Sequence, residues 1–168
     1  MKNRKYIVYI IEDNVFFAKL LEEKILMEGN YETRVFSTGE EALVETDFDA
    51  DIVILDYFLS IKDDSVMNGL EITKRLRLKK SNIPIVILSG QEKIDIAVEL
   101  LNKGACDYIE KNDYAVENVI NSLQKITALK NAYQEILILR KKSTKDKLRM
   151  SLIFTSIIIS IALAFWYY

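Results

Sequence analysis

Continuous runs of apolar, mostly β-branched residues most strongly constrain what this chain can fold into. Such runs lie within three segments that are predicted to be strands, residues 6–11, 51–55 and 83–88. A run that lacks alternating polar residues is typical of a strand covered on both faces, as in a parallel sheet. Residues 31–36 and 106–110 are predicted to form two further strands.

Helical segments separate these strands along the chain. The spacing of apolar residues predicts the segments 14–28, 40–45, 69–80, 92–102 and a long helix from residue 113 onward. Strands that alternate with helices form a parallel α/β sheet with right-handed crossovers. We therefore expect a five-stranded, doubly wound sheet whose ligands lie beyond the carboxyl ends of the strands.

The residue counts exclude several kinds of site. The chain of 168 residues has no histidine and one cysteine, so it lacks a Ser-His-Asp triad, a His-ligated zinc site and an internal disulfide. Residues 1–139 carry 17 Lys/Arg and 24 Asp/Glu, a net charge of −7. This acidic balance predicts no binding to nucleic acid.

The residues at the strand ends could perform phosphoryl chemistry. Glu12 and Asp13 end the first strand, Asp56 ends the third, Ser89 ends the fourth, and Lys111 follows the fifth. Clustered carboxylates resist ionising together, and Mg²⁺ relieves this repulsion through oxygen ligands. A metal, a lysine and a hydroxyl together favour a phosphoryl site. In such a site an aspartate can be the nucleophile.

At five places in order, the sequence resembles the receiver domain of bacterial two-component response regulators. This resemblance covers roughly residues 5–125 and implies a flavodoxin-like fold of the receiver type. The matching segments are Glu12-Asp13, Asp56, Asn68 to Glu71, Ser89-Gly90 and Gly104 to Lys111.

The resemblance implies a role for each site residue. Asp56 would accept a phosphoryl group from a partner histidine kinase or histidine phosphotransfer protein. Asp13, Glu12, Asp56 and the backbone carbonyl of Phe58 would hold Mg²⁺. Lys111 would contact the phosphoryl oxygens. Such a domain signals, and catalyses only its own phosphorylation and dephosphorylation.

The resemblance also implies a switch. Ser89 would move to hydrogen-bond the phosphoryl group, and Tyr108 would turn inward to fill the space. Because phosphorylation adds charge and acceptor oxygens at one place, the surface around the fourth helix and fifth strand would change for a downstream protein target.

One departure from the family leaves alternatives open. Asp56 lies thirteen residues before Gly69, whereas eight is typical of receivers, so the segment 57–68 is unusually long. It could block the site and leave an adaptor that works without phosphorylation. A phosphatase with an aspartyl-phosphate intermediate is a further alternative, although the position of its usual second acid holds Phe58.

The carboxyl-terminal part divides by composition. Residues 140–149 carry six Lys/Arg and one Asp, and residues 150–168 hold 15 hydrophobic residues and no charge. We expect a receiver domain at 1–125, a helical stalk and basic juxtamembrane segment at 126–149, and a transmembrane anchor at 150–168. This predicts a receiver tethered to the cytoplasmic face of the cell membrane by a single-pass anchor. The stalk could also pair two chains as a homodimer.

Overall fold

A computed structural model describes residues 4–45, 48–59, 67, 69–90, 98, 101–102 and 104–167, and for residues 160–165 and 167 it describes the backbone alone. The chain divides into two compact units, Met1–Ile126 and Thr127–Tyr168.

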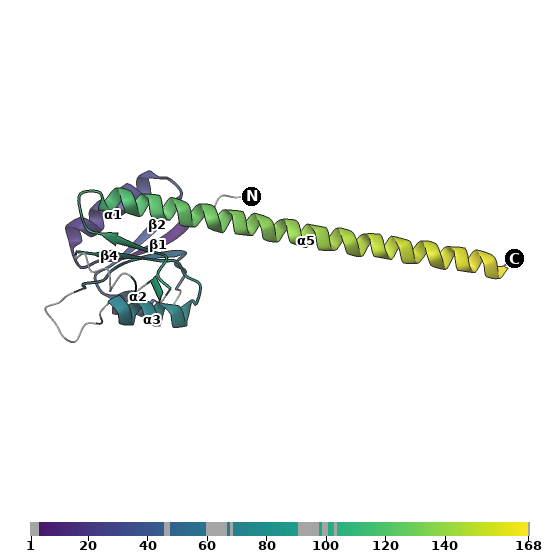
Figure 1. Ribbon diagram of the computed structural model, residues 1–168, viewed down its shortest axis with the longest axis horizontal. Coiled ribbons are helices and arrows are strands. Elements are labelled where there is room, and N and C mark those ends of the chain that lie inside the picture. The colour runs from purple at the N-terminus through teal and green to yellow at the C-terminus, as the bar shows by residue number, and fades with distance from the viewer. Residues whose placement is uncertain are drawn as a thin grey trace. The chain divides into compact units, whose positions relative to one another are not determined.

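The first unit is built on a sheet of five parallel strands (Figure 1). Their order is β2-β1-β3-β4-β5, which is the flavodoxin-like order. The predicted five-stranded, doubly wound parallel sheet is therefore confirmed. The strands are β1 (Tyr6–Ile11), β2 (Tyr31–Phe36), β3 (Ile52–Asp56), β4 (Ile85–Ser89) and β5 (Asp107–Glu110).

Helices cover both faces of this sheet (Figure 1). Leu21 and Ile25 of α1 (Val15–Met27) pack with Val119 and Leu123 of α5 (Ala115–Tyr167) against one face. The other face packs against α2 (Gly39–Val44) and α3 (Gly69–Lys79). The predicted helix over 92–102 falls mostly on residues outside the described part of the chain.

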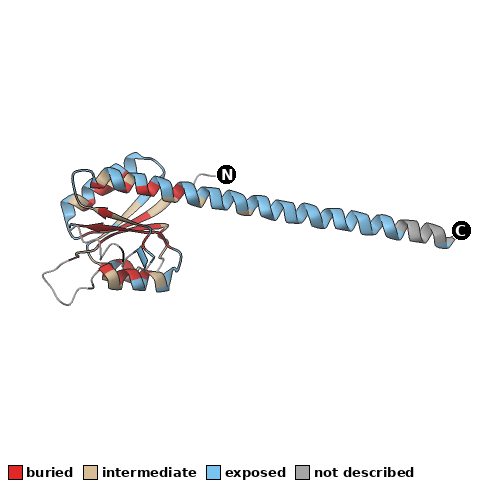
Figure 2. Cartoon of the chain, viewed as in Figure 1, coloured by how far each residue is buried: buried red, intermediate tan, exposed pale blue. Residues whose placement is uncertain are grey.

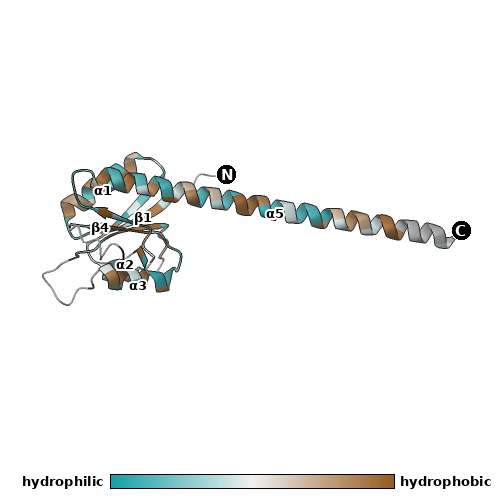
Figure 3. Cartoon of the chain, viewed as in Figure 1, coloured by the Kyte–Doolittle hydropathy of each residue, from teal (hydrophilic) through white to brown (hydrophobic). Residues whose placement is uncertain are grey.

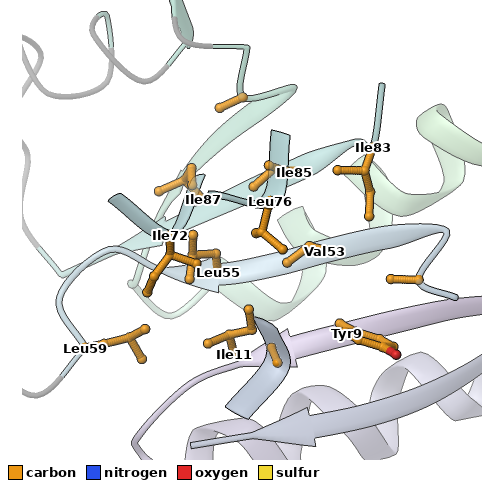
Figure 4. Packing of buried hydrophobic residues seen from close by; sticks show 13 residues of the cluster. Tyr9, Ile11, Val53, Leu55, Leu59, Ile72, Leu76, Ile83, Ile85 and Ile87 are labelled. Carbon is orange, nitrogen blue, oxygen red and sulfur yellow. The ribbon is translucent and has the colours of Figure 1, made fainter. Parts of the chain in front are cut away.

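The central strands are buried on both faces, as their apolar runs predict (Figure 2). Every residue of β3 and β4 is buried. The cluster beneath α2 and α3 is shown in Figure 4, where side chains of β1, β3 and β4 meet Ile72 and Leu76 of α3. This packing holds the strands in register, and therefore positions the residues at their carboxyl ends, such as Glu12, Asp56 and Ser89.

One strand begins later than its apolar run suggests. β4 begins at Ile85, whereas the sequence predicts a start at Ile83. Ile83 instead closes a turn, because its N–H donates to the carbonyl of Lys80 at 3.1 Å. Pro84 therefore lies just before the strand, where its missing N–H leaves no gap in the ladder.

The second unit consists of the later part of α5, from Thr127 to Tyr167. Hydrophobic and hydrophilic stretches alternate along it (Figure 3). Thr155 and Ser156 donate their hydroxyl groups to the carbonyls of Leu152 and Ile153, both at 2.9 Å.

Among the residues that the structure describes, no helix is long and apolar enough to cross a membrane. The predicted transmembrane anchor at 150–168 is therefore not supported. A span needs about 20 consecutive apolar residues, and the described side chains of this segment do not supply that length. The side chains of residues 160–165 and 167 and the whole of residue 168 lie outside the described part.

Candidate functional site

Three of the predicted site residues form a buried ion-paired cluster at the carboxyl edge of the sheet. Glu12 follows β1, Asp56 ends β3 and Lys111 follows β5. The Nζ atom of Lys111 lies 2.7 Å from Oδ2 of Asp56, and 2.9 Å and 2.6 Å from Oε1 and Oε2 of Glu12. Glu12 is 1% exposed and Asp56 4% exposed, so one ammonium group neutralises two largely desolvated carboxylates only in part.

Backbone amides complete the partners of the two carboxylates. The N–H of Asn14 donates to Oε1 of Glu12 at 3.2 Å, and the N–H of Phe58 donates to Oδ1 of Asp56 at 3.0 Å. The backbone also positions Lys111, whose N–H donates to the carbonyl of Ser89 at 2.7 Å. The site is thus held by strand ends and short turns.

Burial and charge shift the protonation equilibria here. Burial and, to a smaller extent, the nearby Asp56 carboxylate raise the pKa of Glu12, whereas the hydrogen bond and charge of Lys111 lower it; the net pKa is raised to about 7. Burial lowers the pKa of Lys111, but hydrogen bonds from its ammonium to Asp56 and Glu12 outweigh this, so the net pKa is raised. The lysine therefore stays charged at neutral pH, and Glu12 ionises reluctantly.

The same carboxylates fit a divalent cation. Glu12, Asp13 and Asp56 each offer an oxygen, and these oxygens lie within 4.8 Å of one another. Oε2 of Glu12 is buried and has no hydrogen-bond partner, although Nζ of Lys111 is close to it. Asp13 is exposed, which leaves one side of the cluster open to water. A hard cation such as Mg²⁺ prefers one or two carboxylates and retained waters.

The other predicted residues lie close by in the fold. Ser89 is buried at the end of β4, next to Leu88, which lies opposite Asp56 in the sheet. Tyr108 is half-buried in β5 opposite Ile87, and packs against the cluster beneath α3. The structure thus brings Glu12, Asp13, Asp56 and Lys111 together, places Ser89 beside them, and leaves Tyr108 deeper along β5.

The described ends of the long segment 57–68 are anchored. Leu59 is buried in the core cluster, and the N–H of Met67 donates to Oε1 of Glu40 at 2.9 Å. The N–H of Gly69 donates to the carbonyl of Tyr57 at 3.3 Å. Residues 60–66 and 68 lie outside the described part, so the alternative in which this segment blocks the site is not tested.

Two residues near the site were not predicted from the sequence. Asn14 caps α1, because its side chain accepts the N–H groups of Phe16 and Phe17, both at 3.1 Å. An asparagine just before an apolar helical pattern is a recognised N-cap signal. The ring of Phe17 lies against Lys111, with Nζ 5.0 Å from its centroid. No sequence signal indicates that contact.

The family model described as the response regulator receiver domain matches residues 8–124. The chain belongs to the response regulator receiver family. The parallel sheet, its strand order and the carboxylate–lysine cluster agree with that assignment.

Individual receiver relatives agree as well. The chain is 35% identical over 105 residues to the cell cycle transcriptional regulator CtrA of Caulobacter vibrioides, and 38% identical over 107 residues to the cell cycle response regulator CtrA of Brucella abortus. Each match covers 62% of this chain and 43% of the relative, so the receiver matches less than half of each relative's length. The receiver domain of NtrX from Brucella abortus is 27% identical, with a TM-score of 0.63, covering 71% of this chain and 96% of that one.

These relatives bear on one expectation about partners. The acidic balance of residues 1–139 led us to expect no binding to nucleic acid, but a relative carries the name of a transcriptional regulator. That expectation is not supported, because net charge describes one part of the chain and does not identify the partners of the whole protein.

Proposed function

We propose that the chain accepts a phosphoryl group on Asp56 from a histidine kinase or a histidine phosphotransfer protein, in a reaction that depends on Mg²⁺. One observation carries the proposal: a buried aspartate at the end of β3 shares Lys111 with Glu12 and lies in a cluster of three carboxylates. The chain has no histidine, which agrees with the proposal because the phosphohistidine then lies outside residues 1–168.

The chemistry follows from the positions of these residues. A carboxylate oxygen of Asp56 attacks phosphorus, the new O–P bond forms, and the P–N bond to the donor imidazole breaks. Lys111 contacts the oxygens of the phosphoryl group, because its ammonium already lies 2.7 Å from Asp56. Glu12, Asp13 and Asp56, together with the carbonyl of Phe58, would hold Mg²⁺, which supplies positive charge for the transferred group.

We propose that Ser89 and Tyr108, which lie next to the site, convert phosphorylation of Asp56 into a change of the protein surface. Ser89 would hydrogen-bond the phosphoryl group, and Tyr108 would turn inward and change the surface at β5. Both residues lie on strands that adjoin the site, Ser89 at the end of β4 and Tyr108 on β5. The downstream target would bind this surface in one of its two states.

A labelling experiment tests the proposal. The purified chain is incubated with acetyl phosphate and Mg²⁺, and the bound phosphoryl group is followed by intact mass and phosphate-affinity electrophoresis. We expect one phosphoryl group on the parent chain and none on Asp56→Asn. The matched control is Asp113→Asn, which alters an exposed carboxylate just beyond Lys111 and should label like the parent. Equal labelling of Asp56→Asn and the parent would refute the assignment.

A titration separates this function from the adaptor alternative. If the site works as proposed, Mg²⁺ binds at millimolar concentration, and Asp13→Asn weakens that binding without unfolding the domain, because Asp13 is exposed. A parent chain that neither binds Mg²⁺ nor takes up phosphoryl groups would support an adaptor that works through its surface alone.

The cellular location of the chain stays a prediction from the sequence. Attachment to the cytoplasmic face of a membrane is tested by fractionating cells that express the whole chain or residues 1–139. Recovery of the whole chain in the soluble fraction, together with the shorter one, would contradict it.

Pairing of two chains through residues 126–149 also stays a prediction. Tyr133 is 60% exposed on α5, and Leu137 follows it at the next four-residue step of the same apolar seam, a spacing that favours helix pairing. Analytical ultracentrifugation of the parent and of a Tyr133→Lys, Leu137→Lys double variant tests it. A parent that sediments as a monomer at every concentration would exclude this pairing.

A further inference from the structure

The ammonium group of Lys111 has an aromatic neighbour in addition to its two carboxylates. The ring of Phe17 on α1 lies with its centroid 5.0 Å from Nζ. The side chain of Lys111 is only 20% exposed. Little of the group therefore remains for water, and the ring replaces part of its hydration.

Phe17 is itself held in place by the fold. Its N–H donates to Oδ1 of Asn14 at 3.1 Å in the first turn of α1. Its side chain is half-buried and packs against the core cluster that includes Leu21 and Val119. The ring is thus fixed on two sides, and Lys111 meets a rigid surface.

An aromatic face attracts a cation without carrying a formal negative charge. A third carboxylate at this position would bind Lys111 more tightly, but it would also repel an incoming phosphoryl group. The ring of Phe17 restrains the ammonium and leaves its charge available to the phosphoryl oxygens. Desolvation strengthens the contact, because cation–π attraction is larger where water is excluded.

We propose that Phe17 is a positioning residue for phosphoryl transfer to Asp56, acting by holding the Lys111 ammonium against the acceptor carboxylate. This inference rests on the proposed function of Asp56. Phe17 touches neither the donor nor the transferred group and acts only through Lys111.

Two variants of Phe17 and one matched control test the inference in the whole chain. Phe17→Leu keeps an apolar side chain and removes the ring, whereas Phe17→Tyr keeps the ring. Phe16→Leu is the control, because Phe16 is the neighbouring ring on α1 and is 89% exposed. If Phe17→Leu fails to fold by circular dichroism, Phe17→Met takes its place.

The first readout does not depend on phosphorylation. A ring above the lysine shifts the NMR signals of the Lys111 ε-methylene protons upfield. We expect this shift in the parent, in Phe17→Tyr and in Phe16→Leu, and its loss in Phe17→Leu. An ε-methylene signal of the parent at the position of an ordinary exposed lysine would overturn the inference.

The second readout is the rate of Asp56 labelling by acetyl phosphate in saturating Mg²⁺. A cation–π contact of ordinary strength predicts that Phe17→Leu is about two- to fivefold slower than the parent. Phe17→Tyr and Phe16→Leu should label at the parent rate. A Phe17→Leu variant as fast as the parent, or a Phe17→Tyr variant as slow as Phe17→Leu, would refute the role of the ring. A parent that takes up no phosphoryl group refutes the function of Asp56 instead, so the two failures are distinguishable.

Discussion

Glu12 should make the metal-free protein less stable as the pH rises through neutrality. Burial raises its pKa from 4.5 to about 7 in the folded chain. The folded state therefore holds this proton more tightly than the unfolded state does. The stability that Glu12 contributes is fully present below pH 4.5 and is lost as the pH rises through about 7. Lys111 stays protonated throughout, because its pKa is raised.

The size of the effect follows from that shift. Each pKa unit corresponds to about 1.4 kcal/mol, so the change at Glu12 corresponds to a loss of about 3 kcal/mol in the free energy of unfolding. Glu12→Gln carries no titrating proton at this position. We expect its free energy of unfolding to change much less than that of the parent between about pH 5 and pH 8.5.

Urea unfolding in EDTA, followed by far-UV circular dichroism, measures this difference. The control is Glu23→Gln, which alters an exposed carboxylate on α1 and should follow the parent curve. Millimolar Mg²⁺ should reduce the loss in the parent at high pH, because a bound cation favours ionised Glu12. Parallel pH profiles for the parent and Glu12→Gln in EDTA would refute the reasoning.

Three substitutions test the packing that supports the site, each by urea unfolding. Gly69→Ala should cost about 1–3 kcal/mol, because its Cβ would lie 2.8 Å from Cα of Tyr57 and the backbone would have to move; an unchanged midpoint would contradict this. Leu123→Ala should cost about 2–5 kcal/mol, since it empties a fully buried position where α5 packs against the sheet; a loss below about 1 kcal/mol, on the order of a surface change, would argue against that packing. Thr38→Ala should cost about 1 kcal/mol, because its hydroxyl oxygen accepts the N–H of Glu41 at the start of α2; Thr38→Ser should retain most of the stability.

The sequence was sufficient to predict the sheet because its signals are local. The apolar runs of β1, β3 and β4 contain few polar residues, so each run identifies a strand covered on both faces. The start of β4 was predicted two residues too early. Ile83 continues an apolar run yet closes a turn, because hydrogen bonding around Lys80 and Pro84 decides where β4 begins.

The carboxyl-terminal segment shows a different limit. Composition alone suggested a membrane span over 150–168, and the described residues do not support it. The segment 57–68 shows the same kind of limit. Its unusual length follows directly from the sequence, but its position relative to the site depends on residues 60–66 and 68, which lie outside the described part.

By itself, the sequence determined which residues end the strands, and the parallel order of those strands required Glu12, Asp56 and Lys111 to meet at one edge. Only the tertiary structure decided how they meet. Lys111 is separated by 55 residues from Asp56 and by 99 from Glu12, and no local pattern specifies which atoms pair across such distances. The contact of Phe17 with Lys111 could not be predicted either, because these two residues are also far apart in the sequence. Helical spacing indicates that Phe17 is partly buried, whereas only the folded chain brings Lys111, the residue after β5, to its ring.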